Sequence, residues 1–226
     1  MSGKYMAYVG SYSYTGKAKG ITVFDVDVEN GMFKERCEIE VDNSSYVIAS
    51  SDGKTLYSIA DEGVVSFRIL PNGSLARLNS APIRGMRGCH LCTDEEDKYV
   101  FVSGYHDGKT TVLSLNPDGS VGKIVDGVFD RGYGSVAERN FRPHVTCTRR
   151  MPDNRFVLSV DNGIDQVKIY RFNDKEQRLV QVDAIRCELE SAPRHFRYSK
   201  DGKFIYLMDA YEDLEKDEKK DSYNPL

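Results

Sequence analysis

The chain has 226 residues, of which 40% are hydrophobic and 29% charged, and its formal net charge is −4. This balance is typical of a soluble globular protein with a real core, and it gives no case for nucleic-acid or membrane partners. No segment approaches the roughly 20 apolar residues that span a bilayer, and the N-terminus lacks an apolar signal core, so we expect a cytoplasmic protein.

The predicted elements are short strands throughout, and no stretch shows convincing helical periodicity. The first segment contains three of them, at Tyr5–Tyr12, Gly20–Asp27 and Met32–Val41. From residue 46 onward a fixed unit recurs, in which a short apolar strand is followed by a tight polar turn and a second strand. The four turns begin at Asp52, Glu96, Asp153 and Asp201.

A repeat of roughly 40–50 residues built from short strands is the signature of a β-propeller blade. The unit that begins at Tyr46 shows all four strands, and its Asp52-Gly53-Lys54 turn uses glycine to supply a positive φ. Its remaining strands are Thr55–Ala60, Val64–Leu70 and Leu75–Ser80. We therefore predict an all-β fold, a β-propeller of four-stranded antiparallel blades whose inner strands start near residues 46, 90, 144 and 195.

Both ends of the predicted propeller are incomplete. About three blades are full, the first segment lacks its innermost strand, and the last unit stops after its second strand near Asp209. Nine of the ten residues from Glu212 to Asp221 are charged, so we divide the chain into a partial propeller domain at 1–211 and a charged C-terminal tail at 212–226. Open strand edges favour self-association. We expect a truncated reading frame; the alternative is a short propeller that closes by dimerisation.

The five cysteines are spread along the chain, and an odd count argues against a disulfide framework. The segment Cys89-His90-Leu91-Cys92 spells CxxC, but no second pair follows it. Core packing is therefore favoured over a metal or redox site, and we expect no metal and no cofactor.

Histidines gather where the chain enters the inner strands. Ligands of propellers bind at the rim formed by these entry loops. His90, His144 and His195 lie there, whereas His106 lies in a turn between the second and third strands of its blade and is expected to lie away from the channel. His144 precedes its turn by nine residues and the other two by six, so we expect its strand to be longer or bulged. The alternative role for each is to cap its loop by bonding a backbone carbonyl.

Four arginines lie in or next to the same loops: Arg87, Arg139, Arg142 and Arg194. Arginine presents a bidentate fork that matches phosphate or carboxylate. Several of them at one channel mouth indicate a small anionic ligand. The alternative is a set of rim salt bridges with Glu138 and Asp130.

Four motifs occur in order between Tyr5 and about Asp209. They are Tyr8-Val9-Gly10-Ser11-Tyr12 with Lys19-Gly20-Ile21-Thr22-Val23-Phe24, the loop from Gly132 to His144, the stretch from Pro152 to Val167, and Ala192-Pro193-Arg194-His195-Phe196 with Asp201-Gly202-Lys203. Together they resemble the seven-bladed propeller lactonase family, which includes the propeller-type 6-phosphogluconolactonases and the fungal carboxymuconate cyclase. This resemblance implies a seven-bladed pattern of which this chain covers about two thirds.

The resemblance implies that the catalytic residues are His144 and Arg194. It also implies a glutamate where this chain has Ala210, and in many members a second histidine where it has Thr146. Together with the position of these residues in or next to the loops that enter the inner strands, it indicates the following substrate-binding residues: Arg87, His90, Arg139, Arg142 and His195.

The implied reaction is hydrolysis of a phosphorylated sugar lactone or similar anionic substrate to the open-chain acid, a step of carbohydrate metabolism of the pentose phosphate type. Neutral His144 would take a proton from water, and Arg194 would stabilise the oxyanion. Two alternatives stay open. One is a muconate-type cycloisomerase in which His144 moves a proton during ring closure; the other is a propeller that binds ligand without catalysis, which Ala210 favours.

Overall fold

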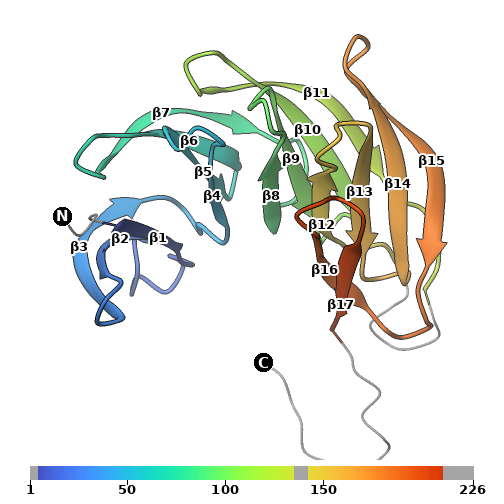
Figure 1. The fold of residues 1–226 in the computed structure, drawn as a ribbon, viewed down its shortest axis with the longest axis horizontal. Helices are drawn as coiled ribbons and strands as arrows, with labels where there is room; N and C mark the ends of the chain where they lie inside the picture. The colour runs from blue at the N-terminus through green and yellow to red at the C-terminus, as the bar shows by residue number, and fades with distance from the viewer. Residues whose placement is uncertain (1–4, 135–141, 211–226) are drawn as a thin grey trace, which may run out of the picture.

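The structure is a computed structural model, and it describes residues 5–134 and 142–210. Its strands form five antiparallel sheets that follow one another around an arc (Figure 1). In chain order the sheets contain three, four, four, four and two strands, each a meander of consecutive strands. The predicted all-β fold of four-stranded antiparallel blades is therefore confirmed. Among the described residues, no helix is long and apolar enough to cross a membrane.

The first two sheets cover the N-terminal part of the arc. The three-stranded sheet contains β1 (Tyr5–Gly10), β2 (Gly20–Asp27) and β3 (Met32–Glu40). The next sheet contains β4 (Val47–Ala49), β5 (Thr55–Ala60), β6 (Gly63–Ile69) and β7 (Leu75–Pro82). These bounds differ from the predicted ones by at most two residues, because tight turns such as the one at Gly53, with a φ of 68°, fix where each strand can begin.

The remaining sheets continue the same plan. The third contains β8 (His90–Thr93), β9 (Tyr99–Gly104), β10 (Lys109–Leu115) and β11 (Val121–Phe129). The fourth contains β12 (Val145–Arg150), β13 (Phe156–Asp161), β14 (Gln166–Asn173) and β15 (Arg178–Arg186). The last pairs β16 (Pro193–Tyr198) with β17 (Ile205–Asp209). The inner strands β4, β8, β12 and β16 lie on the concave side of the arc, as Figure 1 shows.

The hydrophobic core lies between the blades. Four apolar clusters are present among the described residues, and each joins two successive sheets. For example, Ile59 of β5 packs with Leu91 of β8 and Val102 of β9, and all three are essentially fully buried. Alternate side chains of a strand point to opposite faces of its sheet, so a middle blade buries apolar residues on both faces. The arc is therefore one continuously packed body.

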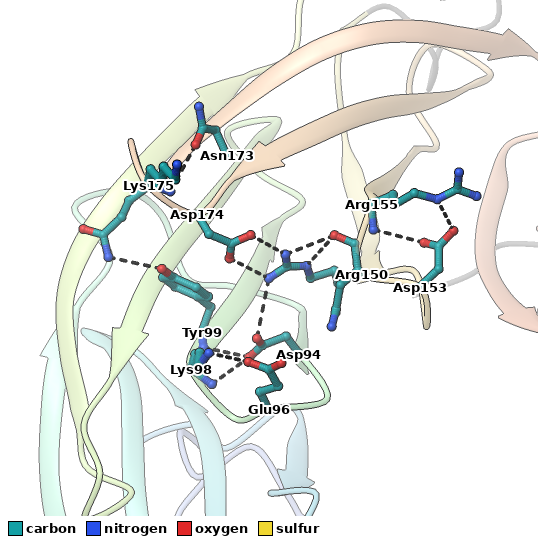
Figure 2. A network of polar contacts seen from close by, with 12 residues as sticks. Asp94, Glu96, Lys98, Tyr99, Arg150, Asp153, Arg155, Asn173, Asp174 and Lys175 are labelled. Atoms are coloured by element: carbon teal, nitrogen blue, oxygen red, sulfur yellow. Dashed lines mark hydrogen bonds and ion pairs between the residues drawn. The ribbon is translucent and has the colours of Figure 1, made fainter.

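A polar network also joins the third and fourth sheets. Figure 2 shows the guanidinium of Arg150, from β12, between two carboxylates, Asp94 at 3.5 Å and Asp174 at 2.8 Å. The Arg150 side chain is 5% exposed and that of Asp94 1% exposed. Asp94 also accepts the backbone N–H groups of Lys98 and Tyr99, each at 2.8 Å. Both buried charges are thus paired, which makes this network a structural link between two blades.

The two end sheets are incomplete within the described residues, as the sequence predicted. The fifth has two strands and the first has three. All five residues of β17 are exposed, including Tyr206 and Met208 at 64% and 59%. The predicted charged tail at 212–226 lies outside the described residues, and so does Arg139.

Candidate functional site

The topology brings two kinds of loop to one end of the blades. In an antiparallel meander the chain enters the first strand and turns between the second and third at the same end of the sheet. The loop before β12, which carries His144, is therefore close to the β9–β10 turn at Tyr105 and to the β13–β14 turn at Asn162 and Gly163. The sequence indicated the entry loops and missed the contribution of these turns.

The His144 ring is fixed by two contacts with Tyr105. It stacks on the Tyr105 ring with centroids 4.3 Å apart and an angle of 17°, and its Nδ1 lies 2.7 Å from the carbonyl oxygen of Tyr105. A carbonyl only accepts hydrogen bonds, so Nδ1 carries the proton and Nε2 keeps its lone pair. Burial lowers the pKa of His144 below its ordinary value. The ring is therefore neutral at neutral pH, with Nε2 as its basic atom.

The backbone around His144 is held by one carboxyl group. Asp161 Oδ1 accepts the N–H of His144 at 2.8 Å and the N–H of Gly163 at 3.0 Å. A Cβ on Gly163 would lie 1.9 Å from the carbonyl oxygen of Arg142 and 2.8 Å from Cδ2 of the His144 ring, so only glycine fits there. Asp161 and Gly163 position His144 without needing to touch a substrate.

Behind Asp161 lies a second carboxyl group. Asp130 accepts the Tyr170 hydroxyl at 2.6 Å, and its other oxygen and Asp161 Oδ2 are both buried without a donor from any other described residue. Two buried carboxyl groups that interact cannot both ionise without a large cost, so we expect them to hold one proton between them. Burial raises the pKa of both, and the charge of Asp130 raises the pKa of Asp161 further. Asp130, which the alternative interpretation of the arginines placed in rim salt bridges, instead belongs to this buried pair.

His106, expected to lie away from the channel, lies at the same end of the blades as His144. Its ring stands edge-on to Tyr105, with centroids 5.5 Å apart, and Tyr105 in turn stacks on His144. Burial lowers the pKa of His144 most, and Arg142 and then His106 lower it further. The physical reason is the meander, which places the β9–β10 turn at the same end of the arc as the entry to β12.

The three rim histidines do not share one register. His90 pairs with Ser103, and His195 pairs with Met208. These two partners are equivalent, because each is the fifth residue of the second strand predicted for its blade, counted from Tyr99 or Phe204. In the blade between them the matching position is Cys147, which pairs with Val160, and His144 comes three residues earlier. The expected bulge is confirmed, because the register of β12 shifts between Val145 and Cys147.

Arg194 lies on β16, the inner strand next to β12. Its side chain is exposed, and its carbonyl oxygen accepts the hydroxyl of Thr146 at 2.7 Å. Thr146, at the position of the second histidine that the resemblance implies, thus ties the two inner strands together. Among the described residues, the side chains of His144 and Arg194 are not joined by a hydrogen bond or a ring contact, so their joint action on a substrate stays a prediction.

His90 and His195 face each other across the inner strands, with ring centroids 6.2 Å apart. His90 is fully buried and packs against Tyr46 at 4.8 Å. Sequence reasoning missed the third member of this group, Arg149 of β12, whose Nη2 lies 3.2 Å from His90 Nε2. Alternation along the strand, two residues after Cys147, is the signal that could have found it.

The other predicted anion-binding arginines have different surroundings. Arg87 forms an ion pair with Asp61 at 2.9 Å and lies over the ring of Tyr12 at 4.9 Å. Arg142 is exposed next to the His144 loop and has an interaction partner of its own. Arg139 lies outside the described residues. Their role in binding a substrate stays a prediction.

Cys147 is buried, and the other four cysteines are partly buried. All five are free, and burial raises the pKa of the Cys89, Cys92 and Cys147 thiols. Among the described residues, no group of three or more His, Cys, Asp and Glu side chains has the arrangement of a metal site.

Comparison with known proteins gives a consistent match to one family. The model of the family described as lactonase, 7-bladed beta-propeller, matches residues 6–211. A protein of Bacillus subtilis named 6-phosphogluconolactonase is 31% identical over 211 residues, which are 91% of this chain and 59% of that protein.

Two solved structures show the same similarity. A Bacteroides fragilis protein, described as a candidate 6-phosphogluconolactonase, has a TM-score of 0.85 and 32% identity, over 92% of this chain and 62% of its own. The periplasmic gluconolactonase of Pseudomonas aeruginosa has a TM-score of 0.82 and 25% identity, over 90% and 60%. The chain thus spans 59–62% of the length of these proteins.

Proposed function

We propose that this chain, which belongs to the family of seven-bladed β-propeller lactonases, takes part in the hydrolysis of a sugar lactone to the open-chain acid. The relatives named 6-phosphogluconolactonase and gluconolactonase support this substrate class. The observation that carries the proposal is the state of His144. Tyr105 occupies its Nδ1 and burial keeps the ring neutral, which leaves a basic Nε2 at the rim.

The reaction follows from that atom. His144 Nε2 takes a proton from water while the water oxygen bonds to the lactone carbonyl carbon. The carbonyl oxygen becomes an oxyanion, and Arg194, exposed on the next inner strand, supplies the positive charge that stabilises it. The intermediate then breaks its bond to the ring oxygen, which receives the proton from the His144 imidazolium. The product is the hydroxy acid, and His144 returns to its neutral form.

Asp161, Gly163 and Tyr105 act in this scheme as positioning residues. They fix the backbone and the ring plane of His144, so little reorganisation is needed when the proton moves. Ala210, at the place of the glutamate that the resemblance implies, donates its N–H to the carbonyl of Ala192 at 2.9 Å, directly before β16. A glutamate there would start beside the strand that carries Arg194.

The test is turnover of 6-phosphogluconolactone and of carboxymuconate by the same preparation. We expect lactone hydrolysis, and we expect His144→Ala to lower kcat roughly 10²–10⁴-fold, the span for loss of a general base. Arg194→Gln should cost a similar factor. Arg155→Gln, an exposed arginine paired with Asp153 at 2.6 Å, is the matched control and should be silent.

Two other outcomes would favour the alternatives. Turnover of carboxymuconate alone would replace hydrolysis by cycloisomerisation. No turnover of either compound, with anion binding retained, would favour a binding module. In that case the Ala210→Glu variant tests whether the lack of a carboxylate at this position explains the lack of lactone turnover. Lactone turnover should rise in this variant if the carboxylate is the one missing group.

A further inference from the structure

Arg149 lies among the inner strands, in surroundings that differ from those of the buried Arg150. It projects from β12 toward His90 and Cys92 of β8, with its Nη2 3.2 Å from His90 Nε2 and its Nη1 3.9 Å from the Cys92 sulfur. Its charge also lowers the pKa of His195 on β16, after the larger effects of burial and Arg194. The guanidinium therefore lies close to residues of three neighbouring inner strands, β8, β12 and β16. These strands line the concave side of the arc (Figure 1).

The charge of Arg149 has no carboxylate partner among the described residues. Its side chain is partly buried and its Nε is buried without a hydrogen-bond acceptor. Its polar neighbours are His90, Cys92 and the Tyr46 side chain, none of which is a carboxylate. A charge withdrawn from water is ordinarily paired, because desolvation without compensation is costly. Arg150, the next residue, obeys this rule with two carboxylates. Arg149 is thus left with unused capacity to bind an anion.

His90 holds the guanidinium in place. Arginine only donates hydrogen bonds, so His90 Nε2 is the acceptor and is unprotonated. Burial, helped by the charges of Arg149 and His195, lowers the pKa of His90 well below its ordinary value, so the ring is neutral. Its Nδ1 then carries the proton, and that donor is buried with no partner in the described structure. Two unused donors, Arg149 Nε and His90 Nδ1, therefore lie in one cluster.

We propose that Arg149 is the principal anchor of an oxyanion, either phosphoryl or carboxylate, bound between β8, β12 and β16, with His90 orienting the guanidinium and His195 beside it. The planar fork of Arg149 suits bidentate binding to such a group. Arg197 is the residue of β16 that is equivalent to Arg149 of β12. Arg197 pairs with Tyr206 and Arg149 pairs with Leu158, and Arg197 is exposed. It can add a second positive charge.

The inference deepens the proposed function and rests on it only for the identity of the occupant. The Arg149 guanidinium contacts His90, which occupies the strand position equivalent to that of Cys147. Cys147 lies three residues from His144 along the chain. Three strand residues span roughly 10 Å, which matches a sugar lactone whose carbonyl lies at His144 and whose anionic end lies deeper. Arg149, rather than the already paired Arg87, then binds that anionic end.

Anion binding is tested without turnover. Thermal unfolding is followed in increasing inorganic phosphate, and separately in acetate, with ionic strength held constant by sodium chloride. We expect phosphate, acetate or both to raise the unfolding temperature of the wild type, and the stronger one identifies the anion class. Arg149→Met should raise the apparent Kd about tenfold or more. Arg149→Lys should fall between, because it keeps the charge and loses the fork. Arg155→Gln should behave as the wild type.

A direct readout covers the case in which a variant does not fold. In the wild type, the ¹⁵N–¹H signal of the Arg149 Nε should shift on addition of the stabilising anion. Equal stabilisation of wild type and Arg149→Met, or no shift of this signal, would overturn the inference. Anion binding that depends on Arg149 without any lactone turnover would instead overturn the proposed function and leave the anion site standing.

Discussion

Arg149 and Arg150 are neighbours in β12 and point to opposite faces of the same blade, and their surroundings differ completely. Arg150 lies between two blades, where two carboxylates neutralise it (Figure 2). Arg149 lies on the inner side with His90 and Cys92, where the described residues offer it no carboxylate. A folded protein keeps an uncompensated charge mainly where something else will pair with it. The contrast separates a face built for stability from a face built for binding.

The largest effect is expected at the compensated arginine. Arg150→Met should lower the free energy of unfolding by about 3–5 kcal/mol, because it leaves the buried Asp94 carboxylate without its cation. Urea unfolding measures this. Arg155→Met, which removes an exposed ion pair with Asp153, is the control and should change the free energy by less than about 0.5 kcal/mol. A similar small loss for Arg150→Met would mean that the inter-blade network is not structural.

The next effect concerns the support of the rim. Gly163→Ala should cost about 1–3 kcal/mol of unfolding free energy, since the new Cβ would collide with the Arg142 carbonyl and the His144 ring. It should also lower lactone turnover by displacing His144. Gly53→Ala is the matched control, because its Cβ meets no atom within 4 Å and only its φ of 68° causes strain. Loss of stability in both variants with turnover unchanged in both would remove Gly163 from the site.

A pH dependence should reveal the shared proton of Asp130 and Asp161. The folded-state pKa of Asp161 is raised by burial and by Asp130, so the folded protein holds a proton that the unfolded chain releases above about pH 4. That stabilisation is complete at acid pH and is lost as the pH rises toward the folded pKa, by up to about 1.4 kcal/mol for each pH unit. Asp161→Asn keeps an acceptor for the His144 N–H and cannot ionise.

Unfolding of wild type and Asp161→Asn at pH 5 and pH 8 checks this prediction. The wild type should lose more stability than the variant over that interval. Parallel pH profiles would show that the two carboxyl groups do not share a proton in the folded state.

The smallest effect is expected at the uncompensated arginine. Arg149→Met should change the free energy of unfolding by less than about 1 kcal/mol, in either direction. Removing a partly buried charge without a carboxylate partner relieves its desolvation, and this offsets the loss of the contacts with His90, Cys92 and Tyr46. The measurement is urea unfolding in chloride buffer without phosphate. A loss of stability as large as that of Arg150→Met would show that Arg149, like Arg150, serves the stability of the fold.

Much of the fold was predictable from local patterns. The repeated turns at Asp52, Glu96, Asp153 and Asp201 place the strands within two residues of their observed bounds, since alternation and turn chemistry act over a few residues. The resemblance pointed to His144 and Arg194; the structure places His144 directly before β12 and Arg194 on β16. The bulge in β12 followed from spacing alone.

What the tertiary structure decided is which residues meet across blades. Tyr105 lies 39 positions from His144 and Asp161 lies 17 positions from it, and no local pattern relates them. The same holds for His90, Arg149 and His195, each from a different blade. The sequence by itself determined the strands, their turns and the repeat, because these depend on near neighbours. Pairing of charges, tautomers and the state of each histidine depends on burial and on contacts between distant segments, which only the folded arc provides.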